Sequence, residues 1–299
     1  MENFAKERAM ILVLTRNHRA QLLNTLESLR QMPGRWPIIV VDNGSSDGTA
    51  AAVASRFPKA MLIRATRDLG AAARNIGVAY VHTPYVAFCD DDTQWEPGAL
   101  DRAADLLDAA PDVAVLSACV QMGATREPNP LCSSMMHSPL AREHLPGPQL
   151  LGFMAGACVM RTRAFYDVGG YWPPFFLGGE EALMALDLAA RGWRIIYADD
   201  VVARHFPASE LDTRQRQYLL IRNAIWLAWM RWPLRAAWRE THIQFTQAHR
   251  CRIFGRVLLQ VLLGLPRALR RRKVISPAIE AMRVQSDHAA VPPLISPGY

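Results

Sequence analysis

Short apolar runs alternate with helical patterns through the first 120 residues of the chain. Four runs have the length and composition of buried strands, namely 10–14, 38–41, 61–64 and 85–89. The first helix is indicated by apolar positions that share one face at the 3.6-residue period, namely Leu22, Leu23, Leu26 and Leu29. A small-residue helix is expected over 70–82, and Pro97 is expected to open another helix at its first position. This alternation predicts an α/β fold, Rossmann-like, with a largely parallel central sheet and helices on both faces.

The pattern is less regular in the middle of the chain. A strand is expected over 113–120. Residues 121–149 follow as a proline- and serine-bearing loop, whose length is typical of a functional lid or a disordered segment. Regular structure is expected to resume over 152–160, continue in a helix from Glu180, and include a strand at 195–197.

Strand–helix alternation stops after about residue 210. The chain then carries amphipathic helical stretches rich in Arg and Trp, followed by a polar tail marked by prolines. We therefore expect an α/β domain over 1–210 and a helical, basic and aromatic appendage over 211–299.

Composition and charge restrict the class of protein and of partner. Of 299 residues, 51% are hydrophobic and 20% are charged, which is typical of a globular protein. The formal net charge of +7 favours an anionic partner, such as a nucleotide-linked substrate, nucleic acid or anionic lipid. No motif that combines basic and stacking residues accompanies this charge, so we expect no nucleic-acid partner.

Cysteine usage and hydropathy indicate the compartment. The five cysteines form no C-x-x-C pair, which argues against a zinc site and a disulfide framework, and free thiols suit a reducing compartment. The apolar run 9–14 is too short for the core of a signal peptide, and no 18 consecutive apolar residues occur. We therefore expect a cytoplasmic protein without a transmembrane helix.

Three consecutive aspartates, Asp90, Asp91 and Asp92, follow the apolar run 85–89 directly. Ligands of open α/β sheets bind at the carboxyl ends of the strands, where this cluster is expected to lie. Asp90 and Asp92 should point the same way, because side-chain direction repeats every two residues. Their mutual repulsion would be relieved by a hard divalent cation that carries a substrate diphosphate. The alternative is a solvated, aspartate-rich turn.

Two further polar residues suit a nucleotide. Asp42 ends the second strand, where its carboxylate can accept hydrogen bonds from a nucleobase or a ribose hydroxyl; the alternative is a turn or cap residue. Arg74 lies in the first turns of a helix and suits an anionic substrate, or is a solvated helix arginine. Dinucleotide-binding and P-loop proteins are unlikely classes, because residues 15–18 contain no glycine and no Walker A pattern occurs.

A second acidic group stands at the start of the helix expected from Glu180. Glu180 and Glu181 follow Gly178 and Gly179. Glutamates in a first helical turn are stabilised by the macrodipole, by about 0.3–1 kcal/mol when exposed, and that alone explains them as well as a general base does. His205 could join a carboxylate on a metal or meet a diphosphate oxygen, or it is a surface histidine.

Taken together, these elements resemble inverting glycosyltransferases of family 2, whose fold is called GT-A. The resemblance covers about residues 10–206 and rests on five local matches in the family's order. The matches are Leu14-Thr15-Arg16-Asn17-His18, Val40-Val41-Asp42-Asn43-Gly44-Ser45-Ser46-Asp47-Gly48-Thr49, Ala73-Arg74-Asn75-Ile76-Gly77, Asp90-Asp91-Asp92, and Gly179-Glu180-Glu181 with Arg191-Gly192-Trp193, Tyr197 and His205.

The resemblance implies a role for each matching residue. The nucleotide-sugar pocket would be lined by Thr15, Arg16, Asp42, Asn43, Arg74, Asp90 and Asp91. The ligands of a Mn²⁺ or Mg²⁺ ion would be Asp92, Asp90 and His205. Glu181 would be the catalytic base, with Glu180 and Gly179 on the acceptor side. Two positions depart from the family, which often has Asp where Glu181 stands and Arg where Asp187 stands.

The activity implied is transfer of a hexosyl or deoxyhexosyl group from a nucleoside-diphosphate sugar to an acceptor hydroxyl, with inversion. The acceptor would be a glycan, a lipid-linked glycan or a small molecule. Two alternatives stay open, a non-catalytic protein that binds nucleotide sugars or carbohydrate, and a sugar nucleotidyltransferase. The second would need a glycine-rich phosphate loop near the first strand, which the chain lacks. Residues 211–273 suit the inner face of an anionic membrane, or pack on the domain or a partner chain.

Overall fold

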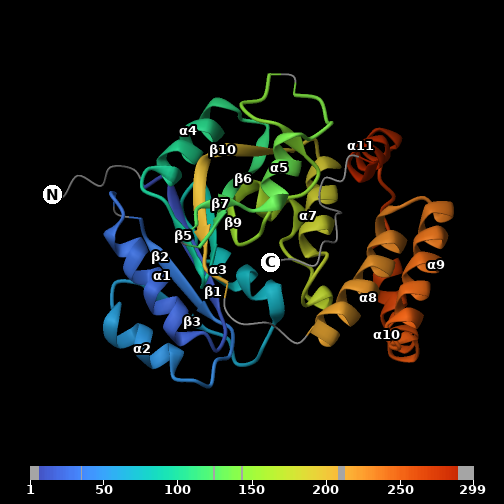
Figure 1. Cartoon of the computed structure of the whole chain (residues 1–299), viewed down its shortest axis with the longest axis horizontal. Coiled ribbons are helices and arrows are strands. Elements are labelled where there is room, and N and C mark those ends of the chain that lie inside the picture. Colours follow the sequence, from blue (N-terminus) through green and yellow to red (C-terminus); the bar gives the residue numbers. More distant parts are fainter. Residues whose placement is uncertain (1–6, 35, 124, 143, 208–212, 289–299) are drawn as a thin grey trace.

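The computed structural model describes residues 7–34, 36–123, 125–142, 144–207 and 213–288 (Figure 1). The strands are β1 Ala9–Thr15, β2 Ile38–Asp42, β3 Met61–Arg64, β4 Tyr85–Asp90, β5 Thr93–Trp95, β6 Val113–Met122, β7 Glu127–Pro128, β8 Gln149–Leu150, β9 Ala157–Arg161 and β10 Arg194–His205. The helices are α1 Arg19–Gln31, α2 Thr49–Arg56, α3 Arg74–Val78, α4 Ala99–Ala109, α5 Pro130–Met136, α6 Thr162–Val168, α7 Glu180–Ala189, α8 Thr213–Arg231, α9 Leu234–Arg250, α10 Phe254–Arg270 and α11 Pro277–His288. Two short 3₁₀ helices are η1 Gly70–Ala73 and η2 Pro173–Phe175.

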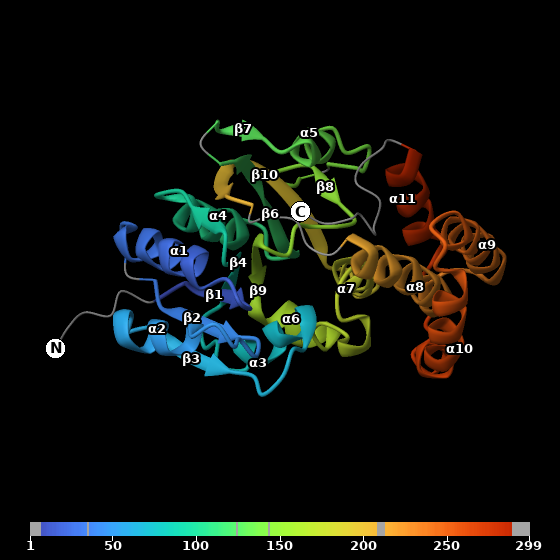
Figure 2. The same ribbon diagram turned by 60° about the horizontal axis from the view of Figure 1, so that its bottom comes forward.

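One mixed sheet forms the centre, in the order β3-β2-β1-β4-β9-β6-β10-β5, with helices on both faces (Figure 2). The first four strands in this order are parallel, as predicted. β9 runs antiparallel to its neighbours β4 and β6, and β5 runs antiparallel to β10, so the other half of the sheet is mixed. The strands next to the centre are continuous apolar runs because both faces of the sheet are covered. The α/β class is therefore confirmed.

The register brings the ends of the parallel strands to one edge. Thr15 at the end of β1 pairs with Asp42 at the end of β2, and Leu14 pairs with Asp90 at the end of β4. Apolar residues precede each of these positions and are fully buried, which anchors the strands in the core. Polar side chains from segments far apart in the sequence therefore meet at the carboxyl edge.

Three local predictions need correction, besides that of the last strand. α4 begins at Ala99, because Gly98 with a φ of +83° stands before its first turn, so Pro97 lies outside the helix. The segment 70–82 is helical only through Val78. Residues 121–149 are not a plain loop, since they contain β7, β8 and α5.

The last strand, β10, is much longer than the predicted 195–197. It runs from Arg194 to His205, with a register shift between Ala198 and Val202. The exposed Asp199 and Asp200 fall in this shift and hid the strand from the hydrophobic pattern. The correction matters because β10 delivers His205, which pairs with Thr93 of β5 beside the aspartate triplet.

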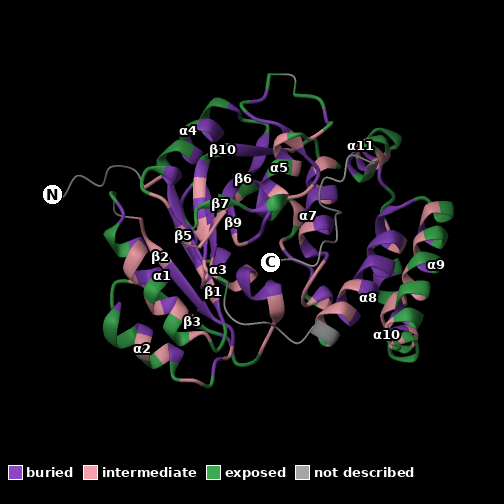
Figure 3. Ribbon diagram, viewed as in Figure 1, coloured by how far each residue is buried: buried purple, intermediate pink, exposed green. Residues whose placement is uncertain are grey.

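All described elements after residue 212 are helices, as predicted, and they lie at one end of the molecule (Figure 1). The predicted boundary at 210 and the tail 289–299 lie outside the described residues. α8 is the helix that joins this group to the sheet domain, because its Trp226 and Leu227 are buried in one cluster with Leu183 and Leu186 of α7. Figure 3 shows this contrast, with buried residues along α8 and exposed ones along the outer sides of α9 and α10.

An ion pair fastens α7 to α8. Arg231 donates from Nε and Nη2 to the two carboxylate oxygens of Asp187, at 2.6 and 2.8 Å, and both side chains are largely buried. The family often has arginine at the position of Asp187. In this chain the carboxylate there binds Arg231, so the position contributes to the packing of α8 on α7.

We expect Arg231→Met to lower the free energy of unfolding by about 3–5 kcal/mol, because it leaves the Asp187 carboxylate buried without its cation. The double variant Arg231→Met/Asp187→Leu should recover much of that loss, since neither charge remains. Urea unfolding measures both. Arg30→Met, which breaks an exposed pair with Glu27, is the control and should cost about 0–1 kcal/mol. A double variant no more stable than the single one would contradict the pairing.

Candidate active site

Two buried polar side chains stand at the carboxyl ends of β1 and β2, and each has an oxygen without a hydrogen-bond partner in the described structure. Asp42 is fully buried and accepts a hydrogen bond at Oδ1 from the Ser45 N–H, at 2.8 Å. Its Oδ2 makes no hydrogen bond among the described residues, although the Arg64 guanidinium lies 3.5 Å away. The Thr15 hydroxyl beside it is likewise buried without a hydrogen-bond partner in the described structure. Buried polar atoms are rarely left unpaired, so these two suit a ligand that brings its own N–H or O–H groups.

Asn43 and Arg16 shape the loop that follows β3. The Asn43 amide donates to Asp68 Oδ1 at 2.8 Å and accepts from the Leu69 N–H at 2.9 Å. Arg16 forms an ion pair of 3.1 Å with the same Asp68. These contacts fix the backbone that leads into η1, so both residues act on the pocket wall in this structure.

Arg74 is a buried cation at the floor of the site. Its Nη2 donates to Asp90 Oδ1 at 2.5 Å, and only 7% of its side chain is exposed. Burial alone would lower the pKa of Arg74, but the carboxylates of Asp90, Glu181 and Glu180 outweigh it and raise the pKa. Arg74 is therefore permanently charged and tied to the acidic groups on both sides of the site.

The aspartate triplet spans the end of β4 and the turn that follows it, because Asp90 is the last residue of β4 and Asp91 and Asp92 form the turn before β5. The two-residue alternation expected for Asp90 and Asp92 therefore does not apply to them. Asp91 points away from the cleft, and the His18 Nδ1 atom lies 3.2 Å from both of its carboxylate oxygens. Asp92 lies beside the end of β10, with its Oδ2 3.3 Å from His205 Nε2. Burial alone would lower the pKa of His205, but Asp92, and then Asp90, raise it. Loss of solvent and the charges of Asp92 and Asp91 raise the pKa of Asp90 against the opposing effect of Arg74.

The donor atoms at Asp92 and His205 fit a divalent cation that is shared with a substrate. Within the described residues, no three His, Cys, Asp or Glu side chains converge as a complete metal site. Mg²⁺ and similar ions often take only one or two carboxylates from the protein and complete their shell with phosphate oxygens and water. The close Asp92–His205 pair matches that incomplete arrangement.

Glu180 and Glu181 begin α7 after two glycines in the left-handed region, Gly178 and Gly179, with φ of +84° and +88°. Burial raises the pKa of both carboxyls, and Arg74 opposes the rise in each. Glu180 is the more buried of the two, since it is 4% exposed and its Oε2 has no hydrogen-bond partner in the described structure, whereas Glu181 is half-buried. Asp90 also acts on Glu181, so the two glutamates share the electrostatic environment of the Arg74–Asp90 pair.

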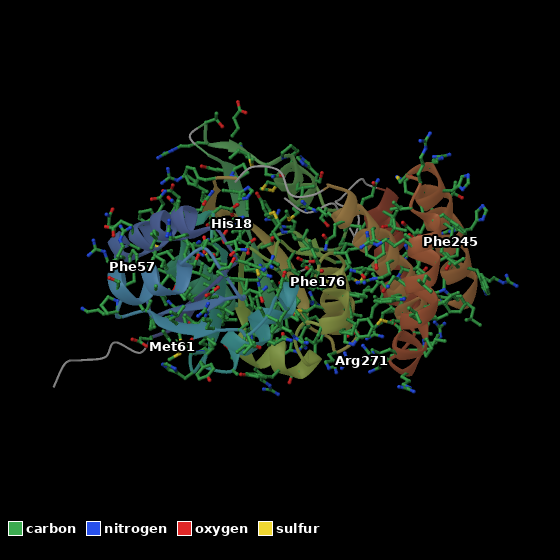
Figure 4. All side chains as sticks on the ribbon, turned by 90° about the horizontal axis from the view of Figure 1, so that it is seen from below. His18, Phe57, Met61, Phe176, Phe245 and Arg271 are labelled. Carbon is green, nitrogen blue, oxygen red and sulfur yellow. The ribbon has the colours of Figure 1, made fainter. Side chains whose placement is uncertain are left out.

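The sequence analysis missed the loop that carries these glutamates into place. Phe176 has φ of +65° and ψ of −61°, and the Leu177 N–H bonds the Phe175 carbonyl at 2.8 Å, which makes a strained γ-turn. The Phe176 carbonyl accepts from the Ala71 N–H at 2.7 Å, so the turn joins the acidic segment to η1. Phe176 lies between the sheet domain and the C-terminal helices, which are orange (Figure 4).

Residues of α8 hold this loop from the other side. Asn223 is fully buried and its amide nitrogen reaches the carbonyls of Phe175, Leu177 and Gly178 at 2.6–3.0 Å. Arg222 donates to the carbonyls of Pro174 and Phe175, at 3.0 and 2.9 Å. Arg216, about two turns nearer the start of α8 than Asn223, opposes the pKa rise of Glu181. The visible signal was an Arg-Asn pair, 222–223, inside an apolar helical run.

The comparisons agree with this geometry. The sequence profile "Glycosyl transferase family 2" matches residues 10–169. An N-acetylglucosaminyl-diphospho-decaprenol L-rhamnosyltransferase of Mycobacterium tuberculosis is 25% identical, over 67% of this chain and 80% of that protein.

Solved structures give the same fold at low sequence identity. The mannosyltransferase PcManGT of Pyrobaculum calidifontis, in complex with GDP-Man and Mn²⁺, is 18% identical over 97% of this chain and 83% of its own, with a TM-score of 0.56. S. aureus TarS 1–349, in complex with UDP-GlcNAc, is 16% identical over 96% and 88%, with a TM-score of 0.61. The GT-A fold and the predicted enzyme class are confirmed, and the chain belongs to glycosyl transferase family 2.

Proposed function

We propose that this glycosyltransferase moves a hexosyl or deoxyhexosyl group from a nucleoside-diphosphate sugar to an acceptor hydroxyl by a single inverting displacement. The observation that carries the proposal is that Arg74 is hydrogen-bonded to Asp90 at the end of β4 and also feels the charges of Glu180 and Glu181 at the start of α7. Asp90 suits a donor and the glutamates suit an acceptor, and a displacement needs both at one carbon.

Donor recognition begins at the edge of β1 and β2. The Oδ2 of Asp42, which makes no hydrogen bond in the described structure, and the Thr15 hydroxyl would bind N–H and O–H groups of the nucleoside. Arg74 would hold Asp90 against the ribose–diphosphate region, with Asp91 supporting the turn through His18. Arg16 and Asn43 would keep the pocket wall in place through Asp68.

Asp92 and His205, with Asp90 beside them, would hold Mn²⁺ or Mg²⁺. When bound, such a cation supplies neutralisation of the negative charge that grows on a departing nucleoside diphosphate. PcManGT, of similar fold, was solved with GDP-Man and Mn²⁺, which supports a cation in this position. The raised pKa of His205 means that its imidazole must lose a proton before its nitrogen can bind a metal.

Glu181 would take the acceptor's proton. Of the two glutamates, Glu180 is the more deeply buried and is expected to hold the shared proton as a neutral acid, because burial penalises the charged form. Glu181 would then be the ionised carboxylate, and a single displacement requires it to approach the donor carbon from the side opposite the leaving group. Glu180 and Gly179 would line the acceptor side.

The acceptor class we propose is a lipid-linked glycan. The relative from M. tuberculosis carries a diphospho-decaprenol acceptor in its name, which supports this choice over a free polysaccharide or a small metabolite. An enzyme that uses cytoplasmic nucleotide sugars and a lipid-linked acceptor would work at the inner face of the membrane.

The test is product formation from a panel of nucleoside-diphosphate sugars, with a polyprenyl-diphosphate-linked N-acetylglucosamine in detergent as the acceptor. Each donor is assayed with Mn²⁺, with Mg²⁺ and with EDTA. We expect one donor to give a glycosylated lipid that depends on the divalent cation. Nucleotide-sugar binding without hydrolysis or transfer under every condition would favour the non-catalytic alternative, and full activity in EDTA would remove the cation from the proposal.

A further inference from the structure

α10 presents its larger apolar side chains to solvent. Leu259 and Leu262 are each 57% exposed, Leu263 is 68% exposed and Leu269 is 41% exposed. The spacing 259, 262, 263 and 269 places these leucines along one broad side of the helix. A surface helix of a globular protein ordinarily turns such a side toward the core, so the arrangement is inverted.

The inner side of α10 is made of small residues. Val257, Val261 and Ala268 are buried, and Gly264 lies directly against Trp226 of α8, where an added Cβ would come within 1.9 Å of the indole. The Trp226 indole N–H also donates to the Val261 carbonyl at 3.2 Å. The packing of α10 on α8 is therefore close and complete without the leucines, whose outward position is fixed by this contact.

Charge around the leucines has a single sign. Residues 241–279 contain seven arginines, one lysine and no acidic residue. Arg256 and Arg267 are exposed and lie along one edge of the leucine side. Arg270, the last residue of α10, is exposed too, as are Arg271 and Lys273 just after the helix. An apolar helical face bordered by basic residues is the pattern of a helix that lies in the interface of an anionic membrane.

We propose that the leucine face of α10 inserts into the headgroup region of an anionic lipid bilayer. The helix would lie parallel to the surface, and across the described residues no helix has the length and apolar character to cross a bilayer. The charge selects the occupant, because acidic lipid headgroups complement the arginines whereas a second copy of this chain would bring the same positive charge. The sequence analysis left membrane binding and packing open for 211–273. In the structure α8 is buried against the domain, and the outer face of α10 is exposed.

The inference rests on the proposed function for its purpose, since a lipid-linked acceptor must be met at a membrane. A short series of contacts connects α10 to the loop that precedes Glu180. α10 packs on α8, and Arg222 and Asn223 of α8 hold the carbonyls of the loop that ends at Glu180. A bilayer bound at α10 would therefore have a fixed position relative to the acceptor side of the site.

Vesicle flotation with the full chain tests the surface. We expect binding to vesicles of phosphatidylglycerol and phosphatidylcholine at 30:70, and much weaker binding to phosphatidylcholine alone. Leu262→Glu/Leu263→Glu should reduce partition to the anionic vesicles by at least about 10-fold. Arg267→Gln/Arg270→Gln should reduce it less and should flatten its dependence on salt. Met61→Glu, at an exposed apolar position on β3, is the control and should bind as the wild type does.

Several outcomes would overturn the assignment. These are no binding of the wild type to anionic vesicles, equal loss in the Met61 control, or undiminished binding by the double-leucine variant. A dimer in gel filtration that the leucine substitutions dissolve, without vesicle binding, would assign the face to a second copy. Activity on the detergent-solubilised acceptor separates this proposal from the previous one, because the leucine variants should retain it. Unchanged melting temperatures show that the variants fold.

Discussion

Glu181→Gln is expected to lower the turnover number by about 10³-fold, within the range of about 10²–10⁴ that a positioned general base contributes. The amide cannot accept the acceptor's proton, but it keeps the size of the side chain and leaves the nucleotide pocket intact. Affinity for the donor's nucleoside diphosphate should therefore stay within about twofold, as measured by calorimetry beside the turnover assay.

Glu180→Gln is the matched control for this substitution. Burial raises the pKa of Glu180 and favours its neutral form, which glutamine imitates, so we expect a loss of no more than about tenfold. If the two substitutions exchanged their effects, the base would be Glu180 and the assignment within the pair would be wrong.

The pH profile gives a second reading of the same residue. Burial and Asp90 raise the pKa of Glu181 above its ordinary value of 4.5, while Arg74 and Arg216 oppose the rise. The base works only when it is ionised, so kcat/KM should fall as the pH drops through a value above 4.5. The residual activity of Glu181→Gln should lack that fall, which a series of single-turnover measurements can show.

Asp92→Ala is expected to reduce metal-dependent turnover by about 10³-fold, because cation stabilisation of a leaving group is worth several kcal/mol. The substitution removes the carboxylate that lies against His205. Mn²⁺ should no longer raise the melting temperature of the variant in the presence of the nucleoside diphosphate, whereas it should do so for the wild type.

Asp101→Ala removes an exposed aspartate in the first turn of α4 and serves as its control. Its effect should be limited to about 0.3–1 kcal/mol of helix stabilisation, with the Mn²⁺ response unchanged. Wild-type dependence on Mn²⁺ in Asp92→Ala would mean that the cation is held elsewhere.

Much of the donor side could be predicted from the sequence because it depends on strand ends. Thr15, Asp42 and Asp90 each follow an apolar run, and parallel pairing of those runs brings their ends to one edge. The place of Asp91 beside His18 could not be predicted in this way, because Asp91 and Asp92 form the turn between β4 and β5. A local sequence pattern is sufficient to predict which side chains meet where strand pairing alone sets their positions.

The acceptor side could be predicted only in part. The glutamates of α7 were visible as a helix start, but their position depends on the γ-turn at Phe176 and on carbonyl contacts from Arg222 and Asn223, some 45 residues later. A pattern of hydrophobic period cannot report such contacts between distant segments. For the same reason the sequence left open whether the C-terminal helices pack on the domain, and in the structure α8 holds the loop that leads to Glu180.

Asp187 departs from the family pattern and has a packing role in this chain. The sequence analysis counted it against an arginine contact near the base. In the structure its carboxylate receives Arg231 from α8, so the position contributes to helix docking. Nothing in its local sequence indicated a partner 44 residues away.

The configuration of the new glycosidic bond tests the central claim most directly. Proton NMR of the product, taken early in the reaction with the active donor and the lipid-linked acceptor, reports the anomeric configuration before any exchange. A single displacement with Glu181 as base predicts the configuration opposite to that of the donor. A product with the donor's own configuration would contradict the account, because it requires a second displacement or a front-face route that this arrangement of carboxylates does not provide.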